Sequence, residues 1–145
     1  MEVPGMVDAE IINRKLQQLE CYLAKLEKHK NVKAPDMEKN MELAWIVEHG
    51  LQLSIQIVLD IGTHILAEEG IIVDEYSNIF GELAKLGVLP EKFARDISGM
   101  AGFRNILVHE YGKIDLKKVA DIMNNHLNDF RQYARYIVQY LGWSF

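Results

Sequence analysis

The longest stretch with helical spacing of apolar residues runs from Asp36 to Gly70 and reads DMEKNMELAWIVEHGLQLSIQIVLDIGTHILAEEG. Its apolar residues recur every three or four positions, the period of one helix face. Asp36 follows Pro35 and is a good helix N-cap, while Gly70 is typical of the position past a helix end. The stretch therefore predicts one long helix. Gly50 and Gly62 lie inside it and predict either a bend or a close approach of another helix.

The same spacing continues on both sides of this stretch, and strand signals are nearly absent. Asp8 and Asp115 are expected N-caps, Gly87 an expected helix end, and Pro90 suits a first helical turn. The remaining helices are expected at residues 8–29, 74–86, 90–109 and 115–141. With three prolines, no internal repeat and no flexible linker, the sequence predicts an all-α fold. We expect an antiparallel helical bundle of four main helices plus one short helix, forming a single domain over residues 1–145.

Composition limits the function. The chain has 145 residues, 49% of them hydrophobic, and a net charge of -5, which argues against coating nucleic acid by bulk charge. The negative charge is concentrated: residues 36–91 carry two positive and eleven negative side chains, whereas residues 92–135 carry eight and five. An anionic ligand is therefore expected at the later segment, although a solvated acidic helix face also explains the asymmetry.

The single cysteine, Cys21, excludes an internal disulfide and a cysteine-built zinc site, and we expect it in the core. No uninterrupted apolar window reaches the roughly 20 residues of a membrane span, and the start MEVPGMVDAE lacks a signal-peptide pattern. These features predict a cytoplasmic protein that is neither exported nor embedded in a membrane.

The segment 90–111, PEKFARDISGMAGFRNILVHEY, carries the most specific information. Projected as one helix, Arg104 and Tyr111 fall on its apolar stripe, where a guanidinium needs a partner or a wet cavity. The opposite face is also small or apolar, so it is expected to contact another helix of the bundle or a second copy of the chain. Its members are Gly99, Gly102, Ile106 and His109.

Arg104 and His109 are five residues apart and would point about 140° from each other on a regular helix. They cooperate only if the helix ends or distorts near His109, or if two chains share one site. The alternative gives Arg104 a buried acidic partner from the second helix and leaves His109 on the surface.

The stretch GFRNILVHEY, residues 102–111, resembles the R-x4-H-x-Y signature of the HEPN superfamily, specifically the HepT-like toxins. The flanking stretches IQIVLDIGTHILAEEG, YSNIFGELAKLGVLP and the final helix are similar to that family as well. The resemblance implies a homodimer with Arg104 and His109 in a composite site near the two-fold axis. It also implies a metal-independent ribonuclease that needs no cofactor. The expected partners are RNA and a nucleotidyltransferase antitoxin that transfers AMP to Tyr111, while Asn105 matches the polar residue common after the arginine.

Residue chemistry is consistent with metal-free RNA cleavage. The ordinary pKa of a histidine side chain lies near neutral pH, so the residue type at His109 suits proton transfer to or from the ribose 2′-OH or the leaving 5′ oxygen. Arg104 suits charge stabilisation on the phosphorane, since its fork grips two phosphate oxygens. Two copies of His109 in a dimer would supply a base and an acid, giving a 2′,3′-cyclic phosphate and a 5′-hydroxyl. AMP on Tyr111 would occupy the RNA path and neutralise Arg104.

Other interpretations are weaker. A bundle di-iron centre needs Glu-x-x-His pairs, and the sequence contains none. Asp60, His64 and Glu68 share a helix face and predict either a cation site or, more simply, a solvated or interhelical polar ladder. The alternative function is a non-catalytic nucleotide- or substrate-binding subunit of a nucleotidyltransferase complex. The pairing of Arg104 with His109 favours the enzyme, because an adaptor needs no proton-transfer group.

Overall fold

The computed structural model describes residues 4–108 and 114–142. Over these residues the chain forms eight α-helices and one 3-10 helix and no strand, which confirms the all-α prediction. The elements are α1 (Pro4–Glu27), α2 (Ala34–Lys39), α3 (Met41–Glu68), η1 (Tyr76–Asn78), α4 (Ile79–Lys85), α5 (Glu91–Asp96), α6 (Gly99–Val108), α7 (Leu116–Asn125) and α8 (Leu127–Leu141).

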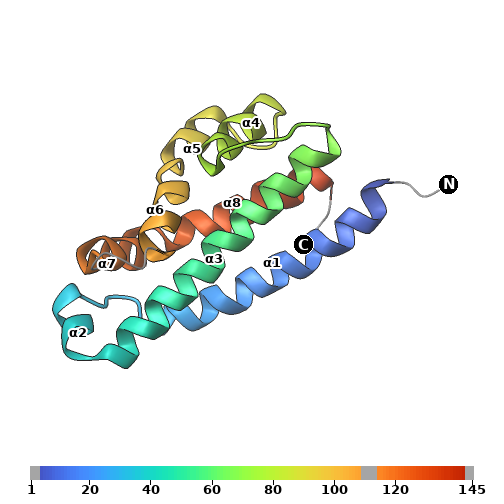
Figure 1. Ribbon diagram of the computed structural model, residues 1–145. Helices are drawn as coiled ribbons and strands as arrows, with labels where there is room; N and C mark the ends of the chain where they lie inside the picture. The colour runs from blue at the N-terminus through green and yellow to red at the C-terminus, as the bar shows by residue number, and fades with distance from the viewer. Residues whose placement is uncertain (1–3, 109–113, 143–145) are drawn as a thin grey trace.

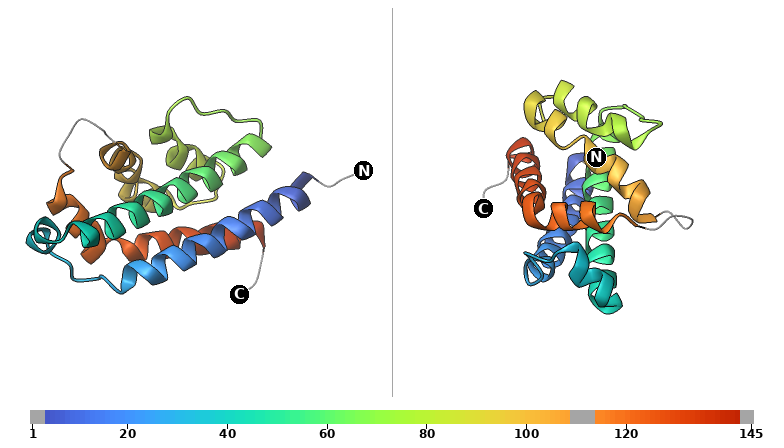
Figure 2. Two further views of the ribbon diagram at one scale, coloured as in Figure 1. Left: turned by 60° about the horizontal axis from the view of Figure 1, so that its bottom comes forward. Right: turned by 90° about the vertical axis from the view of Figure 1, so that its left-hand side faces the viewer.

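Helix α3 is the centre of the bundle (Figure 1). It runs antiparallel to α1, and α8 packs alongside both, while α4 and α6 contact α3 on its other side, as the views of Figure 2 also show. Helices α2 and α7 contact each other at one end. By length and composition α3 alone among the described helices qualifies as a membrane span, and 56% of that window is buried inside the bundle. Its burial is that of a core helix.

Three of the helices expected to be continuous are each broken in two. The break before α3 falls at Asn40, whose side chain accepts a hydrogen bond from the Leu43 backbone N–H (3.1 Å) and so caps α3. Asp36, the expected cap of that helix, instead accepts from the Lys33 backbone N–H (2.9 Å) at the start of α2. A short polar side chain that bonds the nearby backbone competes with helix continuation, which explains this break.

The expected helices at 90–109 and 115–141 are interrupted in the same way. Ser98 follows α5, and its hydroxyl donates to the Arg95 carbonyl (2.8 Å). His126 lies between α7 and α8 with φ -125° and ψ 0°, and its ring contacts the carboxylates of Asp121 (3.3 Å) and Asp129 (2.9 Å). Both breaks are held by local side-chain contacts that apolar periodicity does not reveal.

Some of the other local expectations are confirmed and others are wrong. Asp115 caps α7 by accepting from the backbone N–H of Lys117 (3.1 Å), and Gly70 and Gly87 take φ values of +75° and +79° just past α3 and α4, as expected. Asp8 is not an N-cap, because α1 already begins at Pro4. The expectation of a core cysteine is also wrong, since Cys21 is exposed on α1.

The two glycines inside α3 mark close helix approaches. A Cβ on Gly50 would lie 2.7 Å from Leu26 Cδ2, and one on Gly62 would lie 2.5 Å from Ile79 Cγ2. Helix α3 continues through both positions. Of the two alternatives, close packing is therefore the one that the structure shows.

Candidate functional site

Arg104 lies on α6, where three elements meet. Its side chain is half-buried, and its Nε donates to Gln56 Oε1 on α3 at 2.8 Å. The guanidinium carbon lies 4.7 Å from the ring centroid of Tyr76, in η1, which is the geometry of a cation–π contact. Arg104 therefore has two partners at its half-buried position, an amide that accepts from Nε and an aromatic ring beneath the guanidinium carbon.

The polar contact continues across α3 to α1. Gln56 Nε2 donates to Asp60 Oδ1 at 2.8 Å, and Asp60 Oδ2 lies 3.6 Å from Lys15 Nζ. The side chains of Lys15 and Asp60 remain 29% and 40% exposed, so this ion pair is at the bundle surface and partly screened. We call Lys15, Asp60, Gln56 and Arg104 the polar chain.

The polar chain corrects one expectation about Arg104. The alternative interpretation gave it a buried acidic partner on the second expected helix. Its α3 partner is instead the neutral amide of Gln56, and the carboxylate of Asp60 is one contact further along. With Nε bonded to Gln56, the remaining donors of the guanidinium are its two Nη nitrogens, the pair that forms a fork on a phosphate.

The structure does not describe the side chains of the other expected site residues. His109 and Tyr111 lie outside the described residues, and so does the side chain of Asn105, whose backbone belongs to α6. Their roles stay predictions.

Two glycines of the second face of α6 are not covered by the part of this chain that the structure describes. Gly99 and Gly102 are exposed, and a Cβ built on either would meet no atom within 4 Å. The expectation that another helix of the same chain packs on these glycines is therefore wrong for the described ranges. A second copy is the alternative left from the sequence.

The Asp60, His64 and Glu68 face carries no metal site. Among the residues that the structure describes, no group of three His, Cys, Asp or Glu side chains could hold a metal ion. Asp60 instead joins α1 to α3 through the polar chain. For Asp60, the interhelical polar interpretation is confirmed.

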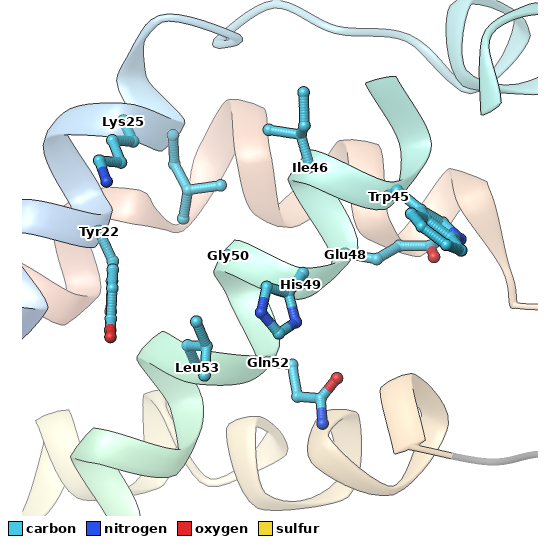
Figure 3. Close-up of a pocket in the computed structure, with 10 residues that line it drawn as sticks. Tyr22, Lys25, Trp45, Ile46, Glu48, His49, Gly50, Gln52 and Leu53 are labelled. Carbon is cyan, nitrogen blue, oxygen red and sulfur yellow. The ribbon is translucent and has the colours of Figure 1, made fainter. Parts of the chain in front are cut away.

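A hollow of about 660 Å³ lies further toward the start of α3. Figure 3 shows Tyr22 and Lys25 on α1, with His49 and Gln52 on α3. At its edge Trp45 is 72% exposed, and burial raises the pKa of Glu48 above its usual value. The exposed surface of its walls is mainly apolar.

Sequence reasoning missed Gln56, Tyr76 and Lys15. Gln56 had a weak signal, because it lies one helical turn before Asp60 on the face already noted as polar. Tyr76 had another, since it opens the flanking stretch YSNIF in the family-like pattern. Lys15 had none.

Comparison with known proteins identifies relatives over most of the chain. A family model described as ribonuclease HepT-like matches residues 19–137. A tRNA nuclease HepT of Aphanizomenon flos-aquae is 34% identical over 139 residues, covering 93% of this chain and 92% of that protein. An mRNA nuclease HepT of Shewanella oneidensis is 30% identical over 84 residues, covering 57% of this chain and 63% of that protein.

A solved structure shares the fold. The tri-AMPylated Shewanella oneidensis HEPN toxin, in complex with its MNT antitoxin, superposes with a TM-score of 0.79 at 24% identity. The match covers 89% of this chain and 97% of that one. The helical bundle described above is therefore that of the HEPN toxins.

Proposed function

Because the chain belongs to the HepT-like ribonuclease family, we propose that it is the toxin of a toxin–antitoxin pair and cleaves RNA without a metal, using Arg104 and His109. The observation that carries this proposal is the pair of contacts that Arg104 makes with Gln56 and Tyr76. A guanidinium held in place by a neutral amide and an aromatic ring is arranged to meet an anion. The 34% identical relative is a tRNA nuclease, so cytoplasmic tRNA is the first substrate to test.

In the proposed reaction the ribose 2′ oxygen attacks the adjacent phosphorus and loses its proton to one His109. The bond to the 5′ oxygen breaks, and a second His109 gives that oxygen a proton. Arg104 stabilises the charge on the non-bridging oxygens of the phosphorane. The products are a 2′,3′-cyclic phosphate and a 5′-hydroxyl end.

This chemistry calls for a homodimer with the site near its two-fold axis. The exposed, small-residue face at Gly99 and Gly102 supports that arrangement, because two helices approach closely where side chains are absent. The second copy would contribute the second His109.

The test of this function uses the purified chain with tRNA in excess chelator. We expect cleavage to continue at an unchanged rate in chelator and to leave cyclic phosphate ends, as measured by end-group analysis. Expression is expected to arrest growth, and His109→Ala is expected to abolish both effects because no proton-transfer group remains. Binding of RNA or nucleotide without cleavage would instead favour the non-catalytic subunit.

We further propose that a nucleotidyltransferase antitoxin silences the site by adding AMP to Tyr111. The solved HEPN toxin is AMPylated and bound to an MNT antitoxin, which supports this regulation. The Tyr111 oxygen would attack the α-phosphorus of ATP, release pyrophosphate and lose its proton to solvent. The added negative charge would offset the positive charge of Arg104.

Co-expression with a nucleotidyltransferase encoded beside this chain is expected to add one or more AMP groups to Tyr111. Mass spectrometry of the peptide that contains Tyr111 measures the addition, and Tyr111→Phe is the matched variant because it lacks only the acceptor oxygen. An unmodified Tyr111, or AMP found equally on the Phe variant, would contradict this regulation.

A further inference from the structure

Gln56 makes two hydrogen bonds that fix its amide in one orientation. Its Oε1 accepts from Arg104 Nε, and its Nε2 donates to Asp60 Oδ1, both at 2.8 Å. A guanidinium only donates and an ionised carboxylate only accepts, so exchanging the amide oxygen and nitrogen would lose both bonds. The contact to Arg104 is therefore directional.

The polar chain gives Arg104 a neutral partner, so its positive charge stays available for a phosphate. Lys15 pairs with Asp60 and offsets its charge, and Gln56 between Asp60 and Arg104 is neutral. A carboxylate bonded directly to Arg104 would hold it equally well but would compete with a phosphate for the same positive charge. An amide at position 56 orients the guanidinium without that competition.

Tyr76 supplies the second restraint. The guanidinium carbon of Arg104 lies over its ring, 4.7 Å from the ring centroid. The cation–π contact holds the guanidinium carbon over the ring, and the bond from Nε to Gln56 restrains the orientation of the group. Together the two contacts restrict the directions in which the Nη pair can donate.

We propose that Gln56 and Tyr76 are positioning residues that orient Arg104 toward the phosphate, with Gln56 itself oriented by Asp60. This inference deepens the proposed ribonuclease function and rests on it. Neither residue needs to touch the reacting atoms.

The test compares Gln56→Leu with Gln56→Glu. We expect Gln56→Leu to lower kcat about 10-fold or more and to change KM by less than about 3-fold, because a misdirected guanidinium loses transition-state contacts. Gln56→Glu keeps an acceptor for Nε, yet we expect it to be less active than Gln56→Leu because its carboxylate offsets Arg104 and faces Asp60. In Gln56→Glu we also expect the plot of log binding constant against log salt concentration to become less steep, by the amount that corresponds to about one phosphate contact.

Gln52→Leu is the matched control, since Gln52 is a half-buried glutamine one turn earlier on the same helix. Its kcat is expected to be unchanged. A kcat for Gln56→Leu within about twofold of wild type, or a Gln56→Glu protein as active as wild type, would overturn the proposal.

A measurement on the folded wild-type protein keeps the inference separate from the ribonuclease function. The Nε–H of Arg104, followed by nitrogen NMR, is expected to exchange with solvent at least about tenfold more slowly than that of exposed Arg95. This protection should be lost in Gln56→Leu and persist in Gln52→Leu. Equal exchange at Arg104 and Arg95 would overturn the positioning role even if RNA is cleaved. Protection in a protein that cleaves no RNA would support the orientation of Arg104 while the ribonuclease function failed.

Discussion

Replacing Arg104 with alanine is expected to lower kcat/KM for RNA cleavage by about 1,000-fold, the scale seen when one preorganised donor to a developing negative charge is removed. The residue combines a permanent charge with a fork whose orientation is fixed by Gln56 and Tyr76. Alanine removes the charge and the fork together. Single-turnover cleavage with excess enzyme in chelator measures the loss directly, without a contribution from product release.

The variant Arg104→Lys separates charge from geometry. Lysine keeps the positive charge but has neither the paired donors nor an Nε–H for Gln56, so we expect it to recover no more than about tenfold of the lost activity. Stability should fall by only about 1 kcal/mol in either variant, because Arg104 is half-buried and water can reach the Gln56 amide.

Arg95→Ala is the control for this experiment. Arg95 is an exposed arginine on the neighbouring helix α5, and its ion pair with Glu91 is exposed on both sides. Such pairs contribute little to stability, so this variant should cleave RNA at the wild-type rate. An Arg104→Ala protein that kept a tenth of its activity, or full rescue by lysine, would contradict the proposed role.

The class of fold could be predicted from the sequence because the apolar period persists along the chain. The same persistence concealed the helix breaks at Asn40, Ser98 and His126. Residues on both sides of each break bury apolar side chains, so the apolar pattern continues although the helical hydrogen-bond ladder is interrupted. Asn40 could have been recognised as a cap by the rule that correctly identified Asp115.

The site could be predicted only as far as its central residue. Periodicity assigns Arg104 to a helix face, but it does not say which side chain faces it from a helix 48 positions away. Charge reasoning required a partner or a wet cavity for this arginine and offered a buried acid as the alternative to a shared site with His109. The structure provides a neutral amide and an aromatic ring, which a search for carboxylates alone overlooks.

Gly62→Ala is expected to destabilise the protein, because the added methyl group would overpack the contact between α3 and α4. The new Cβ would lie 2.5 Å from Ile79 Cγ2, 3.1 Å from Tyr133 Oη and 3.2 Å from Leu83 Cδ1. All three neighbours are at most 1% exposed, so none can move into solvent. Ile79 is β-branched and cannot rotate its Cγ2 away, and Tyr133 is held by its hydrogen bond to the Val58 carbonyl (3.0 Å).

Overpacking of this kind costs about 1–3 kcal/mol, and the better helix propensity of alanine returns about 1 kcal/mol. With three fixed neighbours we expect a net loss of about 2 kcal/mol, or a melting temperature lower by about 4–8 °C in thermal unfolding. Gly81→Ala is the control, because Gly81 lies in α4 with no atom within 4 Å of a Cβ. The free energy of unfolding of Gly81→Ala should rise by about 0.5–1 kcal/mol, from the better helix propensity of alanine alone.

A double variant identifies the contact responsible for the loss at Gly62. Leucine has no branch at Cβ, so Ile79→Leu removes Cγ2 and should restore part of the stability of Gly62→Ala. Ile79→Val keeps both γ carbons and should restore none of it. If the leucine and valine variants behaved alike, the stability loss of Gly62→Ala would not come from the clash between the new Cβ and Ile79 Cγ2.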